Sequence, residues 1–158
     1  MQSQSSYTRG FSLLEILISL AILILITSIT MYSFSAMRAK KQLEIATDSL
    51  SFKLEEAKAY ALTGKGGTNF GVAFPSTTTY VYFVGSTYSI SSLTNATITL
   101  PLNLRIATSL SSGASTISFS RLTGASSATG TITLTDITRS MTTATVTIGT
   151  LGDISVIK

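Results

Sequence analysis

An acidic residue stands inside an apolar run close to the start of the sequence. This residue, Glu15, lies in the stretch RGFSLLEILISLAILILI, which covers residues 9–26. A carboxylate in the hydrocarbon of a membrane costs roughly 2.5 to 3.5 kcal/mol on insertion scales, and such a side chain normally has a partner of opposite charge. The chemistry that this position predicts is therefore the formation of an ion pair.

Other kinds of chemistry lack the residues that they need. The 158 residues include no histidine and no cysteine, which removes the usual general base, the commonest metal ligands and any disulfide. A metal or acid–base site in the C-terminal part would have to be built from Asp136 and Asp153, and neither stands in a calcium-loop pattern. The formal charge of +4 indicates only a weakly basic surface. We therefore expect a protein that is not an enzyme and that holds no metal or cofactor.

The first part of the chain changes character at two points. Residues 1–10, MQSQSSYTRG, are polar and predict a short leader. Residues 11–37 are apolar and, at about 1.5 Å per residue, long enough to cross about 30 Å of hydrocarbon as a helix. Within them, hydroxyl side chains can return their hydrogen bonds to the helix backbone: Ser19, Thr27, Ser28 and Thr30.

The helix is expected to continue without a break into residues 38–64. No proline or glycine lies between Phe11 and Thr63, and apolar residues recur every three or four positions among charged ones, which is typical of an amphipathic helix. Gly64 predicts the end of the helix, with Lys65 near its negative end. The apolar stripe consists of Leu43, Ala46, Leu50, Leu54, Ala57 and Ala61.

Residues 65–158 predict a β-rich globular head. Short alternating runs, separated by turn-prone stretches, indicate half-buried antiparallel strands. A sheet and a helix each bury one face against the other, so the stripe is expected to cover the sheet. The predicted fold class is α+β, with a long N-terminal α-helix packed on a small antiparallel β-sheet domain. The runs are FGVAF (70–74), TYVYFV (79–84), ATITLPL (96–102), TISFS (116–120), GTITLTD (130–136), ATVTIGT (144–150) and DISVIK (153–158).

The stretch RGFSLLE resembles the class III signal of type IV pilins and pseudopilins. That signal joins a short basic leader, a glycine, a phenylalanine and an apolar helix with glutamate at the fifth mature position, here Gly10, Phe11 and Glu15. The resemblance implies that a prepilin peptidase cleaves between Gly10 and Phe11 and that the new amino group of Phe11 is N-methylated. It also implies that Glu15 pairs with the terminal amine of a neighbouring subunit in a filament, which would give the carboxylate its partner.

The C-terminal part is similar to H-type minor pseudopilins and FimT-like minor pilins. The similarity lies in the order of LEEAKAYAL on the helix, FGVAF, ISFSRLTGASSATGTITL and VTIGTLGDISV. It implies a pilin-like fold and a structural subunit, minor in number, of a type IV pilus or a type II secretion pseudopilus. The implied partners are other pilins, the prepilin peptidase and N-methyltransferase, an inner-membrane assembly platform and membrane lipid. The implied location is the cytoplasmic membrane with the N-terminus inside, and afterwards an extracytoplasmic filament or a periplasmic pseudopilus.

Two alternative functions stay open at this point. A DNA-binding tip pilin for DNA uptake would use the cations of the head, Arg105, Arg121, Arg139 and Lys158, although these are scattered and form no basic run. A secreted soluble β domain would carry a conventional signal peptide cut after SFSA, residues 33–36. The apolar run is long for such a peptide, and Glu15 has no place in one.

Overall fold

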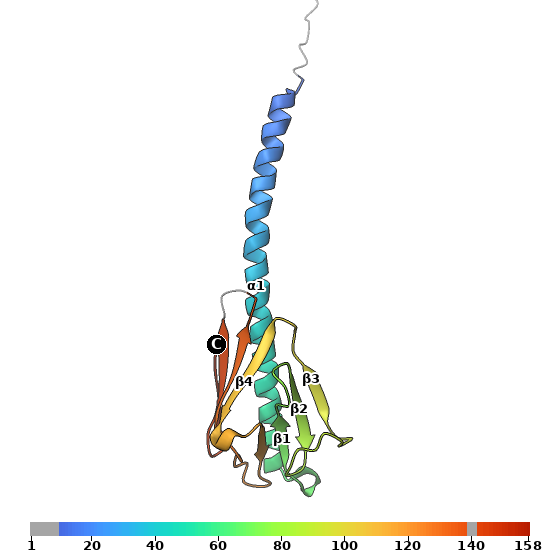
Figure 1. The fold of residues 1–158 in the computed structure, drawn as a ribbon, viewed down its shortest axis with the longest axis vertical. Helices are drawn as coiled ribbons and strands as arrows, with labels where there is room; N and C mark the ends of the chain where they lie inside the picture. The colour runs from blue at the N-terminus through green and yellow to red at the C-terminus, as the bar shows by residue number, and fades with distance from the viewer. Residues whose placement is uncertain (1–9, 139–141) are drawn as a thin grey trace, which may run out of the picture. The chain divides into compact units, whose positions relative to one another are not determined.

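One long helix and two antiparallel sheets make up the fold (Figure 1). The computed structural model describes residues 10–138 and 142–158, and of residues 29–33 and 36 it describes the backbone alone. The chain divides into two compact units, the first ending at Met37 and the second, called the head below, comprising Arg38–Lys158. The helix, α1 (Leu13–Leu62), contributes residues to both units.

The helix is continuous for 50 residues, as the absence of internal glycine and proline predicts. It ends where Gly64 adopts the left-handed conformation with φ of 66°, which glycine reaches without the steric cost that a Cβ would add. The Gly64 N–H donates to the Ala61 carbonyl at 3.0 Å. Lys65 lies beyond this point, with its Nζ 3.5 Å from the centroid of the Tyr60 ring.

The strands form two four-stranded sheets, where the sequence predicted one β-sheet domain. All pairings in both sheets are antiparallel. The first sheet has the order β3-β2-β1-β5, with β1 (Phe70–Ala73), β2 (Thr79–Val84), β3 (Ala96–Thr99) and β5 (Thr116–Phe119). The second has the order β4-β6-β7-β8, with β4 (Leu104–Leu110), β6 (Gly130–Asp136), β7 (Thr143–Ile148) and β8 (Ile154–Ile157).

The strand β4 was not predicted. It pairs with β6 along its whole length, from Leu104 opposite Asp136 to Leu110 opposite Gly130. On the face that carries Leu104, Ile106 and Leu110, which are buried, the fourth position is the exposed polar residue Thr108. One polar residue on the inward face interrupts the apolar alternation that indicates a half-buried strand.

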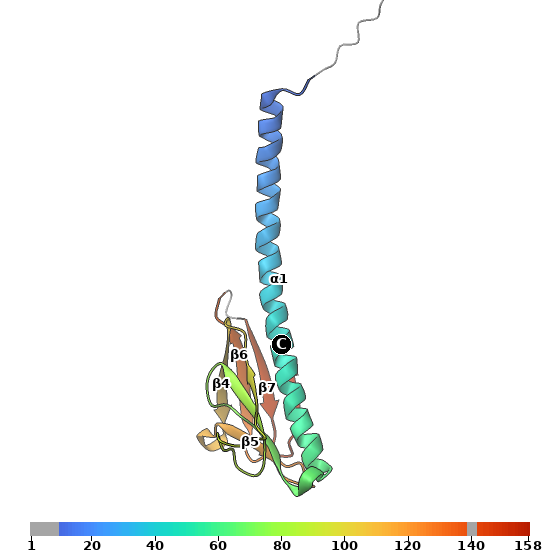
Figure 2. The same ribbon diagram turned by 90° about the vertical axis from the view of Figure 1, so that its right-hand side faces the viewer.

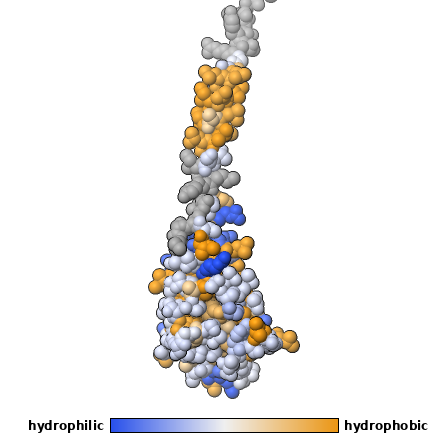
Figure 3. All heavy atoms as spheres, viewed as in Figure 1, coloured by the Kyte–Doolittle hydropathy of each residue, from blue (hydrophilic) through white to orange (hydrophobic). Residues whose placement is uncertain are grey.

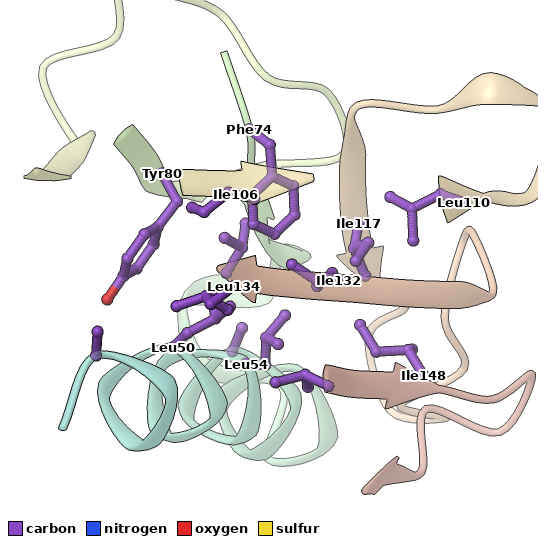
Figure 4. Close-up of a cluster of buried hydrophobic side chains, with 14 of the residues drawn as sticks. Leu50, Leu54, Phe74, Tyr80, Ile106, Leu110, Ile117, Ile132, Leu134 and Ile148 are labelled. Atoms are coloured by element: carbon purple, nitrogen blue, oxygen red, sulfur yellow. The ribbon is translucent and has the colours of Figure 1, made fainter. Parts of the chain in front are cut away.

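The helical stripe and both sheets share one hydrophobic core (Figure 4). The part of α1 that belongs to the head lies along the strands (Figure 2). All six predicted stripe residues are buried, and Leu50 and Leu54 are 0% exposed. Figure 4 shows these two leucines directed at side chains from strands of both sheets, among them Ile117, Ile132 and Leu134. The predicted packing of the helix on the β domain is therefore confirmed.

A buried carboxylate lies at one end of the second sheet. Asp136, at the end of β6, is 3% exposed, and its Oδ1 accepts hydrogen bonds from the Thr138 hydroxyl at 2.7 Å and the Thr138 N–H at 2.9 Å. Burial acts to raise the pKa of this carboxyl, but the bonds from Thr138 and the Asn103 side chain outweigh burial, and the pKa lies below its usual value.

Truncating a buried side chain of the stripe should make the head unfold at a lower denaturant concentration. We expect Leu54→Ala to lower the free energy of unfolding by about 2 to 5 kcal/mol, because the cavity would lie among atoms of both sheets. Ile45→Ala is the matched control, since Ile45 lies on the same helix and is 59% exposed. Denaturant titration of the full chain in detergent would measure both, and equal losses in the two variants would contradict the assigned core.

The Asp136 carboxylate should make stability depend on pH. A carboxyl whose pKa is lowered in the folded state stabilises above its unfolded pKa, near 3.8, and loses that contribution as pH falls through the folded value. Asp136→Asn should therefore be less stable than the wild type at pH 7 by about 1 to 3 kcal/mol, and the gap should narrow below about pH 4. Thr138→Val should lower stability at pH 7 by a smaller amount, which should also shrink below about pH 4. Denaturant titration at pH 3 and pH 7 measures the free energy of unfolding of each variant. A difference between the wild type and Asp136→Asn that is equal at the two pH values would refute this role.

Candidate functional site

The candidate site is the first turn of α1 and the three residues before it, Gly10, Phe11 and Ser12. The helix begins at Leu13, and the Ser12 carbonyl accepts the N–H groups of Glu15 and Ile16 at 3.0 and 3.2 Å. Glu15 thus lies in the first turn of the helix, where the helix dipole favours a negative charge by about 0.3 to 1 kcal/mol. Gly10 and Phe11 precede the helix, and Phe11 is 77% exposed.

Glu15 is exposed and surrounded by exposed apolar side chains. Among the residues that the structure describes, no lysine or arginine lies within ion-pairing distance of its carboxylate. Figure 3 shows the apolar surface of this part of α1. The neighbouring apolar residues are each at least half exposed, and they include Leu13, Leu14, Ile16, Leu17, Ile18, Leu20, Ile22 and Leu23. The site therefore offers a negative charge in an apolar setting with no partner from the described part of its own chain.

The hydroxyl side chains of this segment find their hydrogen-bond partners on the helix backbone. The hydroxyls of Ser19, Thr27 and Ser28 donate to the carbonyls four residues earlier, at 2.7, 2.6 and 2.8 Å, which confirms their predicted role. The side chain of Thr30 lies outside the described residues. The Ser19 bond goes to the Glu15 carbonyl, so it leaves the Glu15 carboxylate free for another contact.

A shallow apolar groove runs beside Glu15. Its lining residues are Phe11, Ile16, Ser19, Leu20 and Leu23. Four of them belong to α1, and Phe11 lies two residues before its start, so the groove follows the surface of one helix and has no opposite wall. This groove was not predicted from the sequence, although the spacing of three to four residues among its lining residues is the ordinary signal of one helix face.

The structure does not confirm the membrane span expected over residues 11–37. No helix of the described part of the chain has both the length and the apolar character that a membrane crossing needs.

The cations proposed to contact nucleic acid do not come together. Arg105 on β4 donates to the carbonyls of Leu102 and Leu104, and Lys158 binds Asp48 at 2.5 Å. Arg121 lies beside Gly64 at the C-terminal end of α1, which is 16 residues, or about 24 Å, from Asp48 along the helix. Arg139 lies outside the described residues. Three separate positions give no continuous track for a phosphate backbone.

The pairing of Lys158 with the helix was not predicted. Its Nζ lies 2.5 Å from Asp48 Oδ1 and 3.8 Å from Glu44 Oε1, and so connects the end of β8 to α1. Lys41 also binds Glu44, and this hydrogen bond and charge lower the pKa of the Glu44 carboxyl. Sequence spacing could not reveal the contact between Lys158 and Asp48, because the partners are 110 residues apart.

Comparison with known proteins gives one sequence match and a set of structural matches. Residues 5–31 match the family model of the prokaryotic N-terminal methylation motif. No curated protein sequence matches the chain.

Two solved structures are similar to this chain in fold. The first is the minor pseudopilin EpsH from the type 2 secretion system of Vibrio cholerae, with a TM-score of 0.57, 17% identity and coverage of 73% of this chain and 96% of that one. The second is the type IV minor pilin FimU of Pseudomonas aeruginosa strain PAO1, with a TM-score of 0.59, 14% identity and coverage of 75% and 90%. The predicted pilin-like α+β fold is confirmed, and so is the resemblance to the type IV pilin and pseudopilin superfamily, in its N-terminal motif and in its fold.

Proposed function

We propose that this chain is a structural subunit, minor in number, of a type IV pilus or a type II secretion pseudopilus. The observation that carries the proposal is a carboxylate with no ion-pair partner among the described residues, in the first turn of an exposed apolar helix segment and within a matched N-terminal methylation motif. The fold similarity to a minor pilin and a minor pseudopilin supports it. The function is structural, and no enzymatic activity is part of the proposal.

Maturation is the first step of the proposed role. A prepilin peptidase removes residues 1–10 by cutting between Gly10 and Phe11, and the new amine of Phe11 is N-methylated. A Cβ built on Gly10 would meet no atom within 4 Å, so the fold itself does not require glycine there. Recognition by the peptidase is a reason for glycine that does not depend on packing.

Assembly then gives Glu15 its partner. The apolar segment holds the subunit in the cytoplasmic membrane, with its N-terminus on the cytoplasmic side, until an assembly platform delivers it to the filament. There the Glu15 carboxylate pairs with the terminal amine of a neighbouring subunit, while apolar helices keep their surfaces covered by packing on each other. In an apolar environment, an unpaired carboxylate costs several times the free energy by which the helix dipole stabilises it. The ion pair between neighbouring subunits therefore favours the axial register in which Glu15 meets the amine.

The DNA-binding and secreted alternatives have less support. The described head cations lie apart and two of them are engaged with carbonyls or carboxylates. The methylation motif match across residues 5–31 favours a prepilin signal over a conventional signal peptide. Neither alternative is proposed as a second function.

Removing the charge of Glu15 should block assembly without affecting maturation. We expect Glu15→Gln to be cleaved normally in its host but to enter sheared filaments about tenfold less than the wild type, because loss of one buried ion pair is worth at least that factor. Ser19→Ala is the control, since the Ser19 hydroxyl binds only the backbone of Glu15 in the described structure. Quantification in the membrane and sheared fractions gives both values. Filaments that contain Glu15→Gln at the wild-type level would disprove the assigned role.

A further inference from the structure

A leucine in the head has an unusual backbone conformation. Leu122, in the turn after β5, has a φ of 66° and is 64% exposed. The left-handed region is disfavoured for residues with a Cβ, and a bulky side chain there is a genuine outlier. Such outliers persist when the surroundings impose them, and they concentrate at functional sites.

The fold needs this conformation but does not need the leucine side chain. The Leu122 N–H donates to the Ala61 carbonyl at 2.9 Å, so the turn satisfies a carbonyl at the end of α1. Glycine would provide the same geometry without steric cost, as Gly64 and Gly124 do nearby with φ of 66° and 65°. Folding alone therefore gives no reason for an exposed leucine at this position.

Leu122 belongs to an exposed apolar patch at the C-terminal end of α1. The patch consists of Leu62, Leu122 and Leu151, which are 43%, 64% and 77% exposed, and is called the helix-end patch below. The Leu122 side chain lies beside Gly64, because a Cβ added to Gly64 would be 3.3 Å from Leu122 Cδ2. The Leu62 side chain lies beside Gly124, because a Cβ added there would be 2.9 Å from Leu62 Cδ2. The Gly124 carbonyl packs against Gly152, the neighbour of Leu151. These distances place the three leucine positions near one another at one end of the head.

The rim of the helix-end patch is positively charged. Arg121 Nε would lie 3.6 Å from a Cβ on Gly64, and Lys65 is held over the Tyr60 ring. Within residues 10–138 and 142–158, no carboxylate forms an ion pair with either cation. Asp153, two residues after Leu151, has its carboxylate against Gly149. The patch thus combines an apolar centre with uncompensated cations.

We propose that the helix-end patch docks a different protein subunit of the filament, through an apolar surface with an acidic rim. This inference rests on the proposed filament role. An exposed apolar patch with a charged rim marks a protein interface, and charge complementarity selects the partner.

A second copy of the chain does not fit this requirement. Of the seven acidic residues in the sequence, Glu15 lies outside the head and Asp136 is buried. Three more are paired with lysines: Glu44, Asp48 and Glu56. Glu55 and Asp153 alone leave the described head without an acidic rim.

Site-specific crosslinking tests the identity of the partner. A photo-crosslinking amino acid replaces Leu122 in the full chain, expressed in its host. Leu93 is the control because it is an exposed leucine on the loop between β2 and β3. The expected result is a crosslink in sheared filaments from position 122, and not from position 93, to a peptide of another subunit that is rich in Asp and Glu.

Variants then test the two features of the patch. With the crosslinker at position 151, Leu122→Gly should lower the crosslink yield about tenfold while the stability of the head stays equal or rises, whereas Leu93→Gly should not change the yield. Arg121→Glu should lower the yield similarly, and reversing the acidic residues of the crosslinked partner peptide to lysine should restore it.

The outcomes separate this inference from the proposed function. A chain that is present in sheared filaments but crosslinks from position 122 to a second copy of itself, to lipid or to nothing overturns the inference alone. Equal yields at positions 93 and 122, or an unchanged yield in Leu122→Gly, do the same. Absence of the wild-type chain from sheared filaments overturns the proposed function and this inference with it.

Discussion

The head depends on the burial of one face of α1 between two sheets. Leu50, Leu54, Ala57 and Ala61 are completely buried, and they contact the inward side chains of both sheets in a single core. Two small four-stranded sheets expose a large apolar area unless a third element covers them. The second half of the helix is therefore a structural part of the head. The first half belongs to the same helix, so the head cannot fold without the element that carries Glu15.

This dependence gives a physical meaning to the position of Glu15. The helix is assigned from Leu13 to Leu62, so the carboxylate in its first turn belongs to the same secondary-structure element as the buried stripe. The helix dipole offsets only about 0.3 to 1 kcal/mol of a cost of several kcal/mol in an apolar environment. The remaining cost must be removed by a charge from outside the described chain, and a neighbouring subunit can supply it.

Much of this architecture could be predicted from local patterns, and the rest could not. The helix, its end at Gly64 and the stripe from Leu43 to Ala61 follow from spacing and from glycine. Strand β4 and the division into two sheets depend on pairings between distant segments, such as β1 with β5, which alternation within a strand does not encode. At the candidate site, Glu15 was singled out by the cost of its charge and by the resemblance of RGFSLLE to a prepilin signal. The helix-end patch could not be predicted, because leucine rarely adopts the left-handed backbone that Leu122 has.

Intact-mass and N-terminal peptide analysis of the chain, recovered from host membranes and from sheared filaments, tests the central claim most directly. The proposed role predicts a mature chain that begins at N-methylated Phe11 and is present in the sheared fraction. A chain that begins near Met37, after the SFSA segment, and is absent from filaments would contradict it. In that case Glu15 would be removed with the signal peptide and could have no part in assembly.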